Sequence, residues 1–496
     1  MVIFPEAVPR AGPEPLAPLE AYLRPYASLF RHPQSRPSWE SLERYVTGLL
    51  TDLPRKNCDA IAAAVAGTTT ERLQHLLTDA DWDALALDEA RVRRLVGVSP
   101  PNGVLVLDDT GLPKQGKASV GVARQSSGTL GKVANCQVVV SAEDVEDTPT
   151  TSTPVHWPVS ARLYLHETWT AATEAAATRR ARARVPAGVR FQTKPESALG
   201  LVDQARAWGV PFAYVVSDAG YGDSPSFLAG LEARRLPYVV GVKRTFGVRW
   251  PEEVQAAAEA PPPPYQGMGR PRVARPAPLW EAQTLLDGLP DASWATVAWR
   301  EGTKETLRKQ FVAVRVHRAT GNPDSGRSAA HGRVTTGPAG WLLGERPVPG
   351  ETGERKASFC WLPDRPLDTP LERLVTLAHA RWPIERFYED AKGACGLDDD
   401  QGRRWDGLHR HLALVMLTDS FLATRRLDNQ PPAPAGFPPL RRATTPPSTA
   451  AADLPRHAPA GAPLALRGPR ALDHDDRPHR AVSRTALPPP SALLTK

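Results

Sequence analysis

The sequence predicts an α/β protein in which helices flank a mixed sheet, with a β-rich insertion and a helical N-terminal domain. Apolar residues recur with a helical period between Trp39 and Leu53. Strand-like apolar runs alternate with capped helical segments between residues 101 and 243. The chain has 496 residues, of which 41% are hydrophobic and 23% charged, so it can form an extensive core. This length corresponds to roughly three ordinary domains or to one domain with a large insertion.

Composition and patterning divide the chain into six segments. Fifteen prolines and one aromatic residue lie between Leu427 and Lys496, so this stretch cannot bury enough apolar surface to offset the entropy of ordering. The helical domain either binds DNA or serves as a purely structural lid. The expected segments are 1–30, a flexible N-terminus; 31–100, the helical N-terminal domain; 101–243, the first part of the α/β core; 244–365, the β-rich insertion; 366–426, the second part of the core; and 427–496, a disordered tail rich in proline, alanine and arginine.

The first part of the core has the pattern of parallel βαβ units. A strand is expected at 104–107, and a capping box of Thr193 and Glu196 opens a helix that Gly209 ends. Two further strands, 212–216 and 238–242, enclose another capped helix. Strands and helices that alternate with short links favour parallel strands in one sheet.

The second half of the chain has a different pattern. Short alternating stretches in 244–365 are separated by turns rich in glycine, proline and serine, which predicts strands. A long helix is then expected from about Leu371 to Gly393, followed by an apolar helix over 408–421.

Charge and cysteine content exclude several classes of protein. The formal net charge of +7 permits a polyanionic partner, no apolar run reaches the length of a membrane helix, and the N-terminus lacks the pattern of a secretory signal. No cysteine pair has metal or redox spacing, so we expect a reduced cytoplasmic protein. The four cysteines are Cys58, Cys136, Cys360 and Cys395.

Two predicted strands end in acidic residues. Asp109 follows the strand at 104–107, and Asp218 follows the strand at 212–216. Ligands gather at the carboxyl ends of parallel strands, so these two carboxylates could share a hard divalent cation such as Mg²⁺. The alternative is that each aspartate merely begins a turn.

A third carboxylate lies in the long predicted helix. At about 100° per residue, Arg381, Glu385 and Lys392 share one helical face, where two cations beside a carboxylate could hold phosphates near a metal. An ordinary solvated stripe with i,i+4 ion pairs remains the alternative.

These residues resemble the DDE transposases of bacterial insertion sequences, in the branch with a Tyr-x2-Arg-x3-Glu-x6-Lys signature. Arg381, Glu385 and Lys392 fit three of its four positions, whereas Ala378 occupies the tyrosine position. The segment LDDTGLPKQGKASVGVARQ at 107–125 is similar to the first-aspartate segment of the family, and VVSDAGYGDSPSF at 215–227 to the second. The resemblance extends over roughly residues 30–426.

The resemblance implies an RNase H-like fold and a two-metal transposase. Asp109, directly before threonine, would be the first catalytic acid, with Asp218 and Glu385 as the others, and all three would hold two Mg²⁺ ions, for which Mn²⁺ can substitute. Arg381 and Lys392 would contact phosphate near the cut. The implied partners are double-stranded DNA, both element ends and target, and a second copy of the chain, in a bacterial nucleoid-associated protein without a membrane.

Further basic residues could contact DNA phosphates. Position in the sequence favours the pair Arg403 and Arg404 after the glutamate helix, and the lysines Lys114 and Lys117 after the first aspartate. The cluster Arg179–Arg184 is equally compatible with a solvated helix face.

Two departures from the family pattern carry structural expectations. Pro383 either kinks the glutamate helix or begins a new one, and residues 141–160 fit poorly where the family continues its sheet. Two other classes of function therefore stay open. They are a catalytically inactive, transposase-derived DNA-binding regulator and an unrelated hydrolase that uses two carboxylates for acid–base chemistry.

Overall fold

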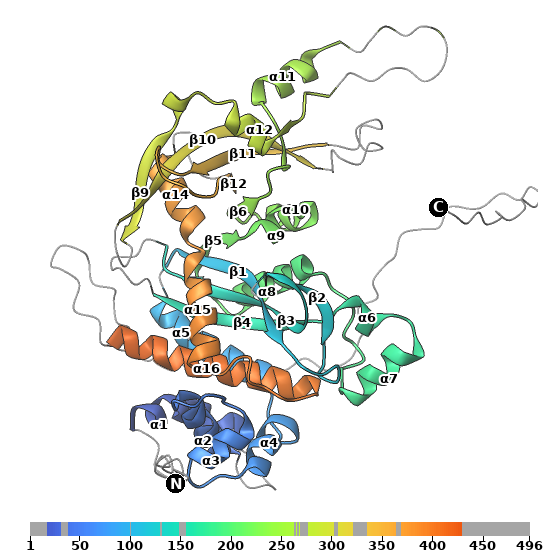
Figure 1. The fold of residues 1–496 in the computed structure, drawn as a ribbon, viewed down its shortest axis with the longest axis vertical. Coiled ribbons are helices and arrows are strands. Elements are labelled where there is room, and N and C mark those ends of the chain that lie inside the picture. The colour runs from blue at the N-terminus through green and yellow to red at the C-terminus, as the bar shows by residue number, and fades with distance from the viewer. Residues whose placement is uncertain are drawn as a thin grey trace, which may run out of the picture. The chain divides into compact units, whose positions relative to one another are not determined.

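The computed structural model consists of one mixed sheet with helices packed on both of its faces (Figure 1). All described residues belong to one compact unit. None of the helices among them is long and apolar enough to cross a membrane. The structure describes residues 17–30, 38–99, 101–128, 131–147, 155–261, 264, 267, 276–301, 306–320, 335–363 and 369–428.

In the described part of the chain the sheet has twelve strands. They run in the order β2-β3-β1-β5-β6-β12-β11-β10-β7-β8, with β4 paired to β3 and β9 paired to β10. The strands are β1 (Gly103–Pro113), β2 (Ala123–Ser127), β3 (Lys132–Val145), β4 (His156–Tyr164), β5 (Phe212–Ser217), β6 (Tyr238–Val242), β7 (Gly247–Arg249), β8 (Trp280–Glu281), β9 (Ala295–Glu301), β10 (Thr306–Thr320), β11 (Thr335–Arg346) and β12 (Lys356–Trp361).

The centre of the sheet confirms the predicted βαβ topology. Strand β1 pairs in parallel with β5, and β5 pairs in parallel with β6. The intervening helices are α8 (Lys194–Ala207), α9 (Ala219–Gly222) and α10 (Pro225–Ala233). The capping box of Thr193 and Glu196 that begins α8 is also present as predicted. Antiparallel β3 and β12 complete a mixed α/β sheet, in agreement with the RNase H-like fold that the resemblance implies.

Alternate residues of β1 enter two separate cores. Val104, Val106 and Leu112 pack with α14 (Leu371–His379), α15 (Trp382–Gly393), α16 (Trp405–Asp428) and the N-terminal helices. Leu105 and Leu107 pack with α8 and α10 on the opposite face. Because successive side chains of a strand point to opposite faces, neighbouring residues of β1 serve different sides of the molecule.

The N-terminal helices and α16 pack together. They are α1 (Ala17–Leu23), η1 (Arg24–Phe30), α2 (Trp39–Leu50), α3 (Cys58–Ala64), α4 (Thr70–Thr78), α5 (Ala84–Leu95) and η2 (Val96–Val98). The expected flexibility of residues 1–30 is wrong for 17–30, because Leu19, Leu23, Tyr26 and Phe30 are buried in the core. Residues 1–16 lie outside the described part.

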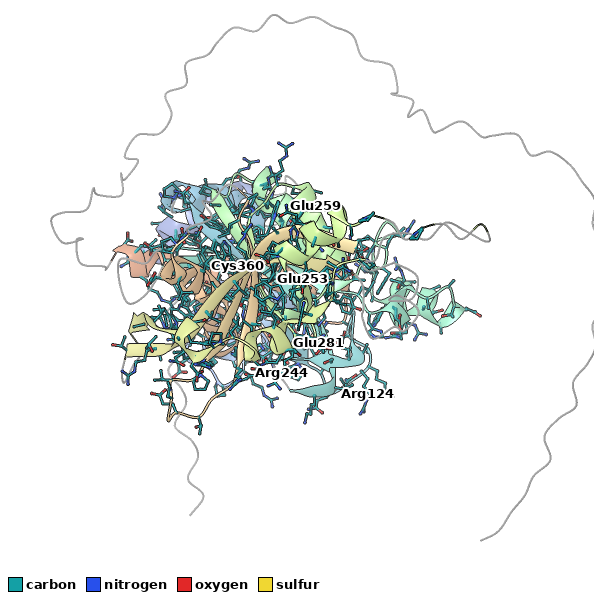
Figure 2. All side chains as sticks on the ribbon, turned by 90° about the horizontal axis from the view of Figure 1, so that it is seen from above. Arg124, Arg244, Glu253, Glu259, Glu281 and Cys360 are labelled. Carbon is teal, nitrogen blue, oxygen red and sulfur yellow. The ribbon has the colours of Figure 1, made fainter. Side chains whose placement is uncertain are left out.

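Strands from the expected β-rich insertion extend the central sheet. Strand β12 pairs antiparallel with β6, so 244–365 continues the core instead of forming a separate layer. This segment also contains α11 (Pro251–Glu259), α12 (Ala282–Asp287) and η3 (Asp291–Ser293), while the short helices α6 (Glu167–Thr170) and α7 (Glu174–Arg182) follow β4. In Figure 2 the buried Cys360 of β12 lies among densely packed side chains, whereas Arg124 of β2 points outward.

Three local expectations need correction. Residues 141–160 do continue the sheet where the structure describes them, because Val138–Val145 of β3 pairs antiparallel with β4. The single helix expected over 371–393 is two helices. Pro383 lies in the first turn of α15, where the missing amide donor has no helical partner to lose. The final helix extends to Asp428, and the rest of the predicted tail lies outside the described residues.

Candidate active site

Parallel pairing brings the two predicted aspartate segments together. Leu107 of β1 is in register with Ser217 of β5, so the next residues along these strands, Asp108 and Asp218, are neighbours. The sequence placed Asp109 after the end of its strand. The structure instead continues β1 through Asp109 to Pro113, because β3 pairs with it along this length.

The Asp218 turn depends on a close approach of two backbones. The Asp218 carboxylate caps α9 by accepting a hydrogen bond of 2.9 Å from the Gly220 amide. A Cβ atom added to Gly222 would lie 1.9 Å from the carbonyl oxygen of Gly241 in β6. Only glycine therefore allows α9 to lie directly against β6, and this contact fixes the position of Asp218.

Asp108 and Asp109 serve opposite faces of the sheet. The Asp109 carboxylate accepts hydrogen bonds from Lys194 Nζ at 2.8 Å and from the Tyr221 hydroxyl at 3.3 Å, both on the α8 and α9 side. The Asp108 carboxylate accepts a hydrogen bond of 2.7 Å from Arg381 Nη1, at the beginning of α15. Asp108, which the resemblance passed over, therefore lies on the side of the glutamate helix.

Carboxylates crowd this part of the sheet, and the pKa values reflect it. Burial raises the pKa of Asp108 to about 7. The Arg381 guanidinium opposes this rise, and the carboxylates of Asp218 and Asp109 add to it. Burial, and then the charge of Asp109, also hold the pKa of Tyr221 well above its usual range, so its hydroxyl remains a hydrogen-bond donor.

Helix α15 connects the predicted signature residues to β1. Arg381 bridges two acids, because its second terminal nitrogen donates to the exposed Glu385 carboxylate one turn along the helix. Farther along α15, Lys392 Nζ donates to Thr110 Oγ1 at 2.7 Å and to the Gly111 carbonyl at 3.3 Å. Burial lowers the pKa of Lys392. Both cations of the predicted stripe thus face β1, as a shared helical face requires.

The other predicted phosphate contacts divide into two groups. Lys114 donates to the backbone carbonyls of Asp398 and Asp400, and Arg404 is ion-paired with Asp79 and Asp406, so both are used within the fold. Lys117 and Arg403 are exposed and line a common pocket, which is described below.

Sequence reasoning missed three side chains of this site. Asp108 could have been found from the alternation of a strand, since it shares the face of Val104 and Val106. Lys194 could have been found from the first turn of the capped helix. The contact of Tyr221 with Asp109 depends on the α9 turn, for which the sequence gives no signal.

The donor chemistry of the site suits a hard divalent cation, since Asp109, Asp218 and Glu385 offer carboxylate oxygens. In the described part of the chain, however, no three histidine, cysteine or acidic side chains are close enough together to hold one metal ion. Asp109 and Glu385 instead contact Lys194 and Arg381.

Comparison with known proteins gives two matches. The family described as DDE superfamily endonuclease matches residues 25–306, a range that includes Asp109 and Asp218 and ends before Glu385. The probable transposase for insertion sequence element IS701 of Microchaete diplosiphon is 30% identical over 237 residues, which are 47% of this chain and 56% of that protein. The chain thus spans little more than half the length of this curated relative. Because the family pattern extends over more than half of the sequence, the protein belongs to the DDE superfamily endonuclease family.

Proposed function

We propose that this protein is a transposase that cuts DNA at the ends of an insertion sequence and joins those ends to target DNA. The observation that carries the proposal is the convergence of three chain segments. The adjacent strands β1 and β5 bring Asp108 beside Asp218, and Arg381 ties Glu385 of α15 to Asp108. The family match and the similarity to a probable transposase support the same reading.

The proposed reaction consists of two in-line displacements at phosphorus. In the first, a water oxygen bonds to the phosphorus at the element end, the bond to the 3′ oxygen breaks, and that oxygen takes a proton to become a 3′-hydroxyl. In the second, this hydroxyl attacks a target phosphodiester and loses its proton, while a target 3′-hydroxyl leaves.

Endonucleases of this superfamily generally use divalent metal ions. We propose Asp109, Asp218 and Glu385 as the ligands of two Mg²⁺ ions, with Mn²⁺ as a substitute; the family pattern favours Asp109 for the first position. Asp108, which shares Arg381 with Glu385, is the competing candidate for that position, and nicking by Asp108→Ala beside Asp109→Ala decides between them. When bound, these ions would supply a water of lowered pKa and positive charge beside the phosphate. The cationic side chains of the protein position the acids before metal binds. Lys194 holds Asp109, and Arg381 orients Glu385 while neutralising Asp108.

The proposed partners follow from this chemistry. Double-stranded DNA supplies both the element ends and the target, and two ends must be brought together before they are joined. We therefore propose that the chain acts as a homodimer on DNA, in the cytoplasm and associated with the nucleoid.

The proposal is tested by incubating the full chain with a labelled duplex that carries an end of its element, with and without Mg²⁺. Terminal inverted repeats in the DNA flanking the gene identify that end. We expect Mg²⁺-dependent nicking that leaves a 3′-hydroxyl, and loss of nicking in Asp109→Ala, Asp218→Ala and Glu385→Ala.

Two other outcomes would replace the proposal. Tight binding of the element end without nicking in Mg²⁺ or Mn²⁺ would indicate a regulator derived from a transposase. Absence of both DNA binding and a metal requirement would favour the hydrolase. Nicking that survives one of the three substitutions would refute the role of that residue alone.

A further inference from the structure

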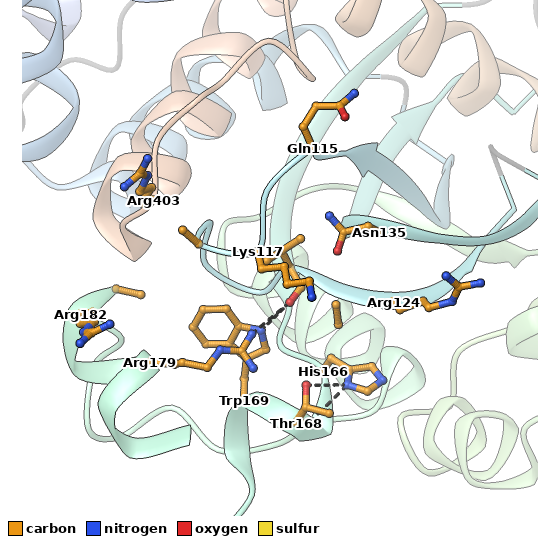
Figure 3. Close-up of a pocket in the computed structure, with 14 residues that line it drawn as sticks. Gln115, Lys117, Arg124, Asn135, His166, Thr168, Trp169, Arg179, Arg182 and Arg403 are labelled. Atoms are coloured by element: carbon orange, nitrogen blue, oxygen red, sulfur yellow. Dashed lines mark hydrogen bonds between the residues drawn. The ribbon is translucent and has the colours of Figure 1, made fainter. Parts of the chain in front are cut away.

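A pocket lined by cationic side chains lies beyond the end of β1 (Figure 3). Its volume is about 1250 Å³, and its walls come from the loop after β1, strand β2, helices α6 and α7, and the segment before α16. We call it the basic pocket. Its basic lining residues are Lys117, Arg124, His166, Arg179, Arg182 and Arg403.

Among the described residues, no acidic side chain neutralises the charge of the basic pocket. No acidic side chain is among the described residues that line it. Its lysine and four arginines form no ion pair with any carboxylate in the described part of the chain. Neighbouring arginines that point elsewhere do form ion pairs. Arg184 pairs with Asp79 at 3.3 Å, and Arg404 pairs with the same carboxylate at 2.9 Å.

The floor of the basic pocket is fixed by buried contacts. Trp169 is 1% exposed, and its indole nitrogen donates to the Val122 carbonyl at 2.9 Å. The Arg179 guanidinium lies 4.1 Å from the centre of the indole ring and also donates to the Val122 carbonyl, at 3.3 Å. The pocket thus holds one of its cations in place before any ligand arrives.

The loop that presents Lys117 is also held in place. The Asn135 amide donates to the carbonyl oxygens of Lys114 and Gly116, at 2.6 and 2.9 Å. The Gln137 amide holds the end of the same loop through the Val120 carbonyl, at 2.7 Å. This loop is therefore preorganised, which lowers the entropy lost when a ligand binds.

The register of the sheet places the basic pocket near the candidate active site. Asp109 pairs with Val140, and Pro113 pairs with Cys136, next to Asn135 of the pocket. Four residues of strand correspond to about 13 Å, and the Lys117 loop extends farther. Duplex DNA rises about 3.4 Å per base pair along its axis, so this separation measured along the axis corresponds to about four to six base pairs.

We propose that the basic pocket binds the phosphate backbone of duplex DNA about four to six base pairs from the bond to be cut, without reading the base sequence. This inference rests on the proposed function. Unpaired cations in a cavity without acids complement a polyanion. The indole of the pocket is buried beneath Arg179 and offers no exposed face for a base, so contact with phosphates is favoured over base stacking.

The test measures DNA affinity of the full chain by fluorescence anisotropy over a range of NaCl concentrations. Two duplexes of equal length are used, one with the element end and one unrelated. The variant combines Lys117→Gln, Arg124→Gln and Arg182→Gln, three exposed side chains for which no internal contact is described. The matched control removes the same charge from exposed arginines elsewhere, through Arg55→Gln, Arg206→Gln and Arg244→Gln.

We expect the pocket variant to lose affinity about tenfold or more, by the same factor for both duplexes. The plot of log affinity against log salt should become shallower, with the size of its negative slope smaller by about 2 to 3. Each phosphate that the variant no longer neutralises reduces that size by roughly one unit. Affinity equal to that of the control variant would overturn the proposal. So would a loss confined to the element end, or a wild-type chain that binds RNA but not duplex DNA.

Failure of this inference and failure of the proposed function can be told apart. If the wild-type chain nicks the element end and the pocket variant binds like the control, the pocket assignment falls and the function stands. If the variant loses affinity but the wild-type chain never nicks, the function falls and the pocket stands. Hydroxyl-radical footprinting with the wild-type chain should show protection of the DNA about four to six base pairs from the nick, and the pocket variant should not give this protection. Unchanged protection by the variant would overturn the location.

Discussion

The carboxylate site and the basic pocket both concentrate arginine and lysine, but they use these charges in opposite ways. At the carboxylates, Arg381 and Lys194 are committed to Asp108, Glu385 and Asp109. In the basic pocket, exposed cations such as Lys117 and Arg182 have no carboxylate partner among the described residues. In the first region the cations contact acids of the same chain, whereas the exposed cations of the second are open to an external anion.

The two regions differ in what their cations contact within the protein. The sequence pattern predicted Arg381 and Lys392 as phosphate contacts, yet Arg381 bridges two acids and Lys392 donates to Thr110 and Gly111 of β1. Carboxylates in a half-buried site need a nearby opposite charge to remain ionised. The contacts of Arg381 therefore support a role in positioning acids, and its predicted contact with phosphate, like that of Lys392, stays a prediction; DNA binding at the basic pocket is the proposal made above.

The largest expected effect is on chemistry at the carboxylates. Glu385→Gln keeps the shape of the side chain but removes its charge, so nicking should fall by about 10³-fold or more while DNA affinity is unchanged. The matched control is Glu389→Gln, an exposed acid one turn along the same helix, which should nick at the wild-type rate. Equal effects of the two substitutions would contradict a special role for Glu385.

Loss of the bridging guanidinium should have the next largest effect. Arg381→Ala frees Glu385 and leaves Asp108 without its cation, so nicking should fall by about 10² and stability by about 1–2 kcal/mol. Adding Asp108→Asn should recover most of the stability, because the unpaired buried charge is then absent. Arg386→Ala, on the exposed side of α15, is the control. Urea denaturation of the two single variants and the double variant measures their losses of unfolding free energy. If the loss in the double variant equals the sum of the two single losses, the bridge between Arg381 and Asp108 is excluded.

Asp144 tests the rule that a buried carboxylate needs a cation. It is 1% exposed in β3. Burial raises its pKa to about 7. The Ser99 hydroxyl lowers the pKa, and the Glu143 carboxylate raises it further. Because the folded state holds this proton more tightly than the unfolded chain, stability is full below about pH 4 and decreases as the pH rises through 7.

Asp144→Asn should therefore increase the free energy of unfolding more at pH 8 than at pH 5. The two increases should differ by about 2–3 kcal/mol. Denaturation in urea at the two pH values measures this difference, and the exposed Glu281→Gln serves as the control (Figure 2). A gain of equal size at both pH values would show that Asp144 does not titrate in this window.

The smallest expected effects are those of substituting two adjacent arginines, Arg403 and Arg404. Arg404 is ion-paired with Asp79 and holds the pKa of that carboxyl at about 2, whereas Arg403 lines the basic pocket. Arg404→Ala should lower stability at pH 7 by less than about 1 kcal/mol, since the pair is partly exposed. This loss should disappear as the pH falls toward 2. Arg403→Ala should instead weaken DNA binding severalfold without a change in stability. Weaker DNA binding in Arg404→Ala together with lower stability in Arg403→Ala would contradict the distinction between the two regions.

Local patterns predicted much of the fold. The capping box at Thr193 and the alternation of strands with capped helices fixed α8 and the parallel β5 and β6. The pairing of β12 with β6 was not predictable, since no local pattern encodes which strand will neighbour another. The break between α14 and α15 was one of two readings of Pro383, and only the packing of both helices decides between them.

The candidate site was predicted in outline but not in its contacts. The sequence indicated which acids follow or occupy strands, and a family resemblance indicated which glutamate accompanies them. It missed Asp108, because choosing between adjacent aspartates requires knowing which face of β1 meets α15. The sequence did name Lys117, Arg403 and the cluster Arg179–Arg184 as possible phosphate contacts. It did not show that these distant segments line one pocket.

The separation of chemistry from DNA binding is tested most directly by single-turnover nicking measured over a range of protein concentrations. For the triple pocket variant, the account predicts a half-saturating concentration about tenfold higher, with an unchanged maximal rate. For Asp109→Asn, it predicts an unchanged half-saturating concentration and a maximal rate lower by about 10³ or more. A pocket variant that lowers the maximal rate at saturation, or an Asp109→Asn chain that nicks at the wild-type rate, would contradict the account.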